Sequence, residues 1–142
     1  AEVGLTFRGW LPNFRVPEVF ARHRVTVHVP RRPYVEALPG IPTIRVFEAL
    51  ASGIPLVSAP WRDEEQLFGA DTFLMAKSGA EMQASLGLVL DQPRAAAEMA
   101  ARGRRAILAA HTCGHRADQL LEIASAIGVP AAFDDRERQE QL

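Results

Sequence analysis

The feature that most restricts the fold of this chain is an alternation of short apolar runs with longer segments of helical period. Residues 25–29 (VTVHV) are rich in β-branched side chains and end at Pro30, which is typical of a strand. Residues 43–52 carry apolar side chains at helical spacing, and Gly53 follows as a helix stop. The next run, residues 55–60, is short and apolar like a buried parallel strand. The pattern predicts an α/β fold with a parallel sheet.

The remaining elements are expected from the same patterns. We expect strands over residues 3–8 and 72–76, and helices over residues 12–22, 63–67, 79–90, 94–110 and 116–127. Residues 30–42 hold four prolines and Gly40, which predicts a loop without regular structure. This loop follows the carboxyl end of a strand, the edge at which open α/β sheets bind ligands.

Composition excludes several classes of protein. With 142 residues, 48% of them hydrophobic, we expect one domain over residues 1–127 and a charged tail over residues 128–142. A net charge of -1 argues against nucleic-acid binding, which needs a basic excess. No apolar run is long enough to span a membrane, there is no secretory signal, and the one cysteine cannot form an internal disulfide. We therefore expect a cytoplasmic protein.

The candidate ligand site lies in residues 39–61. A helix that starts directly after a Pro/Gly loop exposes backbone N–H groups, so a phosphate is expected near Thr43 and Ile44. Glu48 follows one and a half turns later, where its carboxylate can accept hydrogen bonds from two vicinal hydroxyls, such as those of a ribose. The alternative is that Glu48 is a surface carboxylate on an ordinary helix.

Further polar and aromatic residues follow the two strands. Arg31, Arg32 and Tyr34 come after the first, where they either contact a phosphate or base or lie on a solvated loop. Trp61 comes after the second, where it either stacks on a base or packs under a loop.

His111, Cys113 and His115 form a second cluster of reactive side chains. Two histidines four residues apart suggest a metal site, but Gly114 argues against an unbroken helix and a fourth ligand is lacking. A Cys113–His115 nucleophile pair is a further alternative, and helix-end packing or capping is the interpretation that we favour. We predict no metal site.

The segment FEALASGIPLVSAP resembles the signature of GT-B glycosyltransferases that use nucleotide sugars. Together with the longer IRVFEALASGIPLVSAPW, FRGW, VTVHVP and a later HTCGHRADQLL, it resembles the group 1 glycosyltransferase domain of CgeB-like spore-maturation proteins. The resemblance covers roughly residues 5–125.

This resemblance implies the carboxyl-terminal, donor-binding half of a fold built from two facing Rossmann-like domains. It implies that Glu48 binds the donor ribose, and that Thr43, Ile44 and Arg45 lie beside the diphosphate. The donor is then a nucleoside diphosphate sugar, with no metal or other cofactor, because helix dipole and basic side chains stabilise the departing diphosphate.

The chain also departs from the family pattern. Many retaining relatives carry a glutamate eight residues before the ribose-binding one, where this chain has Gly40, and Pro42 removes one N–H from the phosphate loop. The amino-terminal acceptor domain and the opening strand and helix of the donor domain are missing from the sequence, so we expect the isolated chain to be inactive. The alternative is a non-catalytic binding or assembly module that self-associates through an uncovered apolar face.

Overall fold

The computed structural model describes residues 7–129. The chain forms two compact units, Ala1–Ile107 and Leu108–Leu142. The predicted boundary between a domain and a tail at residue 127 stays a prediction, because most of that tail lies outside the described residues. In chain order the elements are η1 (Asn13–Arg15), α1 (Val16–Phe20), β1 (Thr26–His28), α2 (Arg32–Ala37), α3 (Ile44–Ser52), β2 (Leu56–Ser58), β3 (Leu74–Met75), α4 (Gly79–Asp91), α5 (Pro93–Ala110) and α6 (Cys113–Ala126).

The three strands form one parallel sheet in the order β1-β2-β3. Thr26 pairs with Leu56 and His28 with Ser58, so β1 and β2 end side by side. The parallel sheet and the surrounding helices confirm the predicted α/β, Rossmann-like fold.

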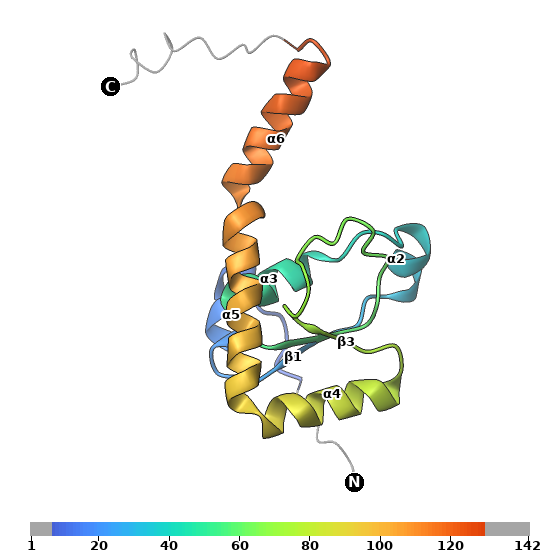
Figure 1. Cartoon of the computed structure of the whole chain (residues 1–142), viewed down its shortest axis with the longest axis vertical. Helices are drawn as coiled ribbons and strands as arrows, with labels where there is room; N and C mark the ends of the chain where they lie inside the picture. The colour runs from blue at the N-terminus through green and yellow to red at the C-terminus, as the bar shows by residue number, and fades with distance from the viewer. Residues whose placement is uncertain (1–6, 130–142) are drawn as a thin grey trace, which may run out of the picture. The chain divides into compact units, whose positions relative to one another are not determined.

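The central strand β2 is buried on both faces. Leu56 joins a core cluster with Val46 and Leu50 of α3, whereas the next residue, Val57, joins a second cluster with Val89 of α4. Because neighbouring side chains of a strand point to opposite faces, the two helices must cover opposite sides of the sheet. Figure 1 shows this arrangement, with α3 on one side of the strands and α4 on the other. The first unit therefore has three layers.

Helix α3 follows the prediction for residues 43–52 closely. Thr43 is its N-cap residue, and Gly53 ends it in the left-handed conformation, with φ +69° and ψ +30°. Gly53 N–H donates to the carbonyl of Leu50. A residue with a Cβ adopts this conformation only with strain, which explains the glycine.

Two sequence predictions are wrong. Residues 30–42 contain a helix, α2, instead of an irregular loop. Pro33 lies in its first turn, where a missing N–H costs no helical hydrogen bond, so the prolines permit this short helix. Residues 63–67 form turns and not a helix, because Gln66 takes a left-handed φ of +48° that interrupts helical geometry.

The predicted first strand, residues 3–8, lies almost wholly outside the described residues; Phe7 and Arg8 are irregular. The last helix starts earlier than predicted, at Cys113. Within the described part of the chain, no helix combines the length and the apolar character needed to cross a membrane.

Candidate functional site

Two buried polar residues occupy the carboxyl ends of β1 and β2. His28 is 5% exposed and Ser58 is fully buried, and the two are paired in register. Neither residue was among the predicted site residues. A signal was present, because each of them stands two residues before a proline, Pro30 or Pro60, at the end of an apolar strand.

His28, Ser58 and Thr43 form a directed chain of hydrogen bonds. The Ser58 hydroxyl donates to the Ala59 carbonyl at 2.8 Å, and a carbonyl can only accept. Ser58 Oγ therefore accepts from His28 Nδ1 at 2.9 Å, which leaves Nε2 of a neutral imidazole as an acceptor. The Thr43 hydroxyl donates to this Nε2 at 2.8 Å.

The charge state of His28 agrees with this direction. Burial lowers the pKa of His28, and the nearby positive charge of Arg45 lowers it further. The imidazole is therefore neutral at neutral pH, as an accepting Nε2 requires.

The amino terminus of α3 lies directly above this chain of hydrogen bonds. Although Thr43 is the N-cap residue, its side chain makes no capping hydrogen bond. Val46 N–H donates to the Thr43 carbonyl at 3.1 Å, so the groups that lack a capping acceptor are the N–H groups of Ile44 and Arg45. Free N–H groups at the positive end of a helix dipole attract anions.

Arg45 and Glu48 lie on the same side of α3. Arg45 Nη1 is 2.7 Å from Glu48 Oε2, and the side chains are 44% and 20% exposed. Glu48 Oε2 is buried and accepts no hydrogen bond, so its contact with Arg45 is an ion pair without the direction of a hydrogen bond. This carboxylate can accept hydrogen bonds from a ligand.

The structure brings Thr43, Arg45 and Glu48 together, but not all the predicted site residues. Arg31 and Arg32 are exposed at the start of α2, and Tyr34 is half-buried on the same helix. No hydrogen bond or ion pair within residues 7–129 joins these three to the start of α3. Their contact with a ligand stays a prediction.

Trp61 lies in an aromatic cluster. Its ring stacks on Phe73, with centroids 5.2 Å apart and planes at 19°, and meets Phe68 edge-on. Among the described residues, the buried indole Nε1 has no hydrogen-bond partner. Trp61 thus packs against other side chains, as one of the two sequence-based alternatives expected. The other alternative, stacking on a base, stays a prediction.

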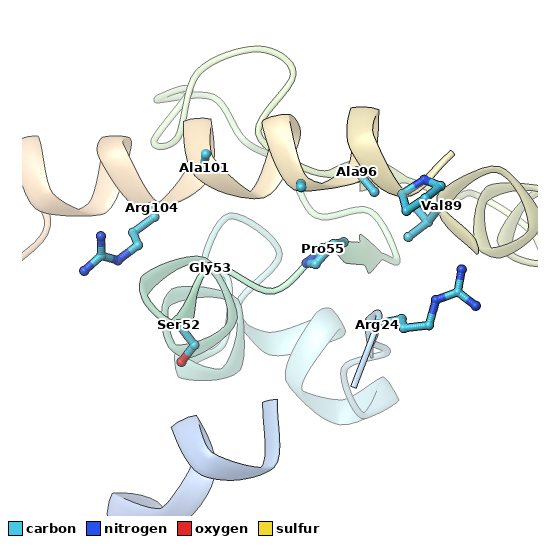
Figure 2. A pocket seen from close by; sticks show the side chains of 10 residues that line it. Arg24, Ser52, Gly53, Pro55, Val89, Ala96, Ala101 and Arg104 are labelled. Atoms are coloured by element: carbon cyan, nitrogen blue, oxygen red, sulfur yellow. The ribbon is translucent and has the colours of Figure 1, made fainter. Parts of the chain in front are cut away.

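A cavity of about 490 Å³ lies at the other end of the sheet. Gly53 and Pro55, which line it, precede β2, and Arg24 and Arg104 lie toward its two ends (Figure 2). The concave surface and the polar site therefore occupy opposite edges. We assign the function to the carboxyl edge, because ligands of open α/β sheets bind there and because the directed polar groups are there.

The second unit holds the cluster that suggested a metal. His115 and Thr112 form the capping box of α6, in which Thr112 Oγ1 accepts from His115 N–H and the His115 side chain accepts from Thr112 N–H. His115 thus has the helix-capping role that we favoured over a metal site or a nucleophile pair. Within residues 7–129, no three His, Cys, Asp or Glu side chains are grouped as ligands for a metal ion.

Comparison with known proteins gives the family. The sequence model described as glycosyl transferase-like matches residues 2–122, which include all three strands and the whole α3 site. No curated protein and no solved structure matches the chain. Since the family match covers most of the chain and the fold is the expected parallel α/β sheet, the chain belongs to the glycosyl transferase-like family.

Proposed function

We propose that this domain holds the nucleoside diphosphate of a nucleotide-sugar donor at the carboxyl edge of its sheet. Membership of the glycosyl transferase-like family makes sugar transfer the reaction class. The parent enzyme is then of the GT-B type, similar to CgeB-like proteins, and moves a sugar from the diphosphate to an acceptor.

The observation that carries this proposal is the state of Glu48. Within residues 7–129, its Oε2 is buried, accepts no hydrogen bond and forms an ion pair with Arg45 at 2.7 Å. The ion pair with Arg45 balances the charge of this carboxylate but supplies no hydrogen bond, so a ligand hydroxyl would complete its partners. The vicinal hydroxyls of a ribose are donors of the required kind, and a carboxylate can accept from both.

The diphosphate is assigned to the start of α3. The N–H groups of Ile44 and Arg45 face no capping side chain, and the Arg45 side chain is 44% exposed. Groups placed in this way stabilise the negative charge that grows on the diphosphate as its bond to the sugar breaks. We propose that they do so without a divalent metal ion.

The acceptor belongs to a different part of the proposed enzyme. In a two-domain glycosyltransferase the acceptor is bound by the facing domain, so we assign no acceptor site to the domain described here. We therefore propose that the isolated chain binds its donor nucleotide without transferring sugar.

Ligand-observed NMR titration with UDP, GDP and ADP tests the proposal. We expect one of them to bind with a dissociation constant in the millimolar range or below, and Glu48→Ala to weaken binding about tenfold. Glu98→Ala is the matched control, because Glu98 also pairs with an arginine on its own helix, at 3.2 Å from Arg94 Nε, but belongs to α5. Equal binding by the Glu48 and Glu98 variants would rule out the assigned ribose contact.

One observation favours a second function, an assembly module. In the second unit, Leu120, Leu121, Ile123 and Ile127 of α6 and the turn after it are 57–72% exposed. A second copy of the chain would bury such side chains. Mass measured by light scattering over a hundredfold range of concentration tests this: a dimer that Leu120→Lys disrupts supports it, and a monomer throughout excludes it.

A further inference from the structure

Within residues 7–129, three N-cap residues carry hydroxyl side chains, and one of them behaves differently. Ser78 Oγ accepts from Glu81 N–H at 3.2 Å, and Thr112 Oγ1 accepts from His115 N–H at 3.4 Å. Thr43 makes no such bond at the start of α3.

The backbone does not explain this difference. Thr43 has φ -73° and ψ 159°, and Thr112 has φ -79° and ψ 166°. The same residue type in nearly the same conformation therefore caps one helix and leaves the other uncapped. Both hydroxyls lie near a histidine ring nitrogen, at 2.6 Å from His115 Nδ1 for Thr112 and at 2.8 Å from His28 Nε2 for Thr43. What differs is where the histidine lies, because His115 is in the first turn of the helix that Thr112 caps, whereas His28 is on strand β1.

The position of His28 is itself fixed. Its other ring nitrogen, Nδ1, is held by Ser58 Oγ at 2.9 Å, and Ser58 is fully buried in the central strand. His28, at the end of β1, thus offers its Nε2 as an acceptor to the Thr43 hydroxyl. When the Thr43 hydroxyl donates to Nε2, its oxygen stays on the side of the helix terminus that faces the sheet. The oxygen is then outside the capping position.

We propose that His28 is a positioning residue, which holds the Thr43 side chain so that the first-turn N–H groups of α3 stay open for the donor diphosphate. This inference rests on the proposed function and deepens it: it names the device that prevents α3 from capping itself. Replacing His28 releases the Thr43 hydroxyl, which then competes with the diphosphate for the N–H group of Arg45.

A double-mutant cycle tests the inference. Inorganic pyrophosphate is the probe, since it reports on the diphosphate subsite without base or ribose. We expect His28→Leu to weaken its binding about fivefold when Thr43 is present, the effect of one N-cap. In a Thr43→Val background, His28→Leu has no further effect, because no hydroxyl remains to be released.

The dependence on Thr43 separates positioning from a merely structural role. If His28 only supports the fold, its replacement weakens binding by the same factor in both backgrounds. That result, or unchanged binding by His28→Leu alone, overturns the inference. Circular dichroism confirms that each variant is folded before the comparison is made.

Amide hydrogen exchange keeps the inference testable if the chain binds neither pyrophosphate nor a nucleoside diphosphate. In that case the proposed function fails. Slower exchange of the Arg45 amide in His28→Leu, and not in the double variant, still supports the positioning role. Unchanged exchange overturns that role.

The wild-type protein offers a check if His28→Leu does not fold. Nitrogen-15 NMR of the imidazole distinguishes its tautomers. The inference expects a neutral ring with the proton on Nδ1 at pH 7. A proton on Nε2 overturns it, because that nitrogen could no longer accept from Thr43.

Discussion

His28 and Ser58 face each other across β1 and β2, with Nδ1 2.9 Å from Oγ. The two strands thus end in a buried polar contact instead of an apolar one. Because the ring is neutral in this contact, we expect protonation of His28 to destabilise the folded protein.

Stability is therefore expected to fall in acid through His28. Its pKa is lowered in the folded protein, first by burial and then by Arg45, so the unfolded chain takes up a proton at a pH where the folded imidazole is still neutral. Stability is full above about pH 6.5, the value for an unfolded histidine, and falls as the pH drops from there toward the folded pKa.

Urea unfolding between pH 7.5 and 5.5 measures this effect. The free energy of unfolding of the wild type should fall more steeply than that of His28→Gln, by at most about 1.4 kcal/mol per pH unit for one proton. Parallel curves for the two proteins would show that His28 is not the group responsible.

Gly103 supports the contact between α5 and α3 by having no side chain. A Cβ at this buried position would lie 2.6 Å from Leu50 Cδ2 and 3.1 Å from the Thr72 carbonyl oxygen. We expect Gly103→Ala to destabilise the protein by about 1–3 kcal/mol, as overpacking does.

Gly87 is the matched control for Gly103. It also lies inside a helix, α4, but a Cβ there meets no atom within 4 Å. Gly87→Ala should stabilise the protein by about 0.5–1 kcal/mol through helix propensity alone. Thermal unfolding compares the two variants, and a loss of stability in both would argue against the packing explanation.

Elements whose ends are marked by local sequence signals could be predicted, whereas elements that break the usual sequence rules could not. Helix α3 could be predicted because Thr43 and Gly53 mark its ends and its apolar face follows the helical period. Helix α2 could not be predicted in this way. A proline such as Pro33 is tolerated in the first turn of a helix but disrupts a helix at later positions.

The candidate site was predictable in part. Thr43 and Glu48 belong to a motif within one segment, so spacing places them together. His28 and Ser58 are thirty residues apart, and only the register of β1 with β2 shows that they meet. Local patterns in a sequence do not contain that register.

Arg45 should contribute charge to donor binding. We expect Arg45→Gln to weaken binding of pyrophosphate and to reduce the dependence of affinity on salt, since one cation beside the anion is lost. Titrations at about 50 and 200 mM NaCl measure both effects. Arg94→Gln is the control, because Arg94 forms the corresponding pair with Glu98 on α5. A salt dependence equal in the two variants would speak against a role for Arg45.

Removal of metal ions should leave nucleotide binding unchanged. The proposed site uses the N–H groups of Ile44 and Arg45 and the Arg45 side chain to hold the diphosphate. We expect the affinity for the nucleotide in an excess of EDTA, on the order of 5 mM, to equal its affinity in the same concentration of Mg²⁺. A large loss of affinity in EDTA would show that a divalent ion is part of the site.

The most direct test is to locate the bound nucleotide. Backbone amide NMR shifts of the whole chain are recorded while UDP, GDP or ADP is added. The account predicts that the largest shifts occur at Ile44, Arg45 and Glu48, at the start of α3. The largest shifts at Gly53 and Arg104, which line the cavity at the opposite edge, would contradict it, as would the absence of shifts with all three nucleotides.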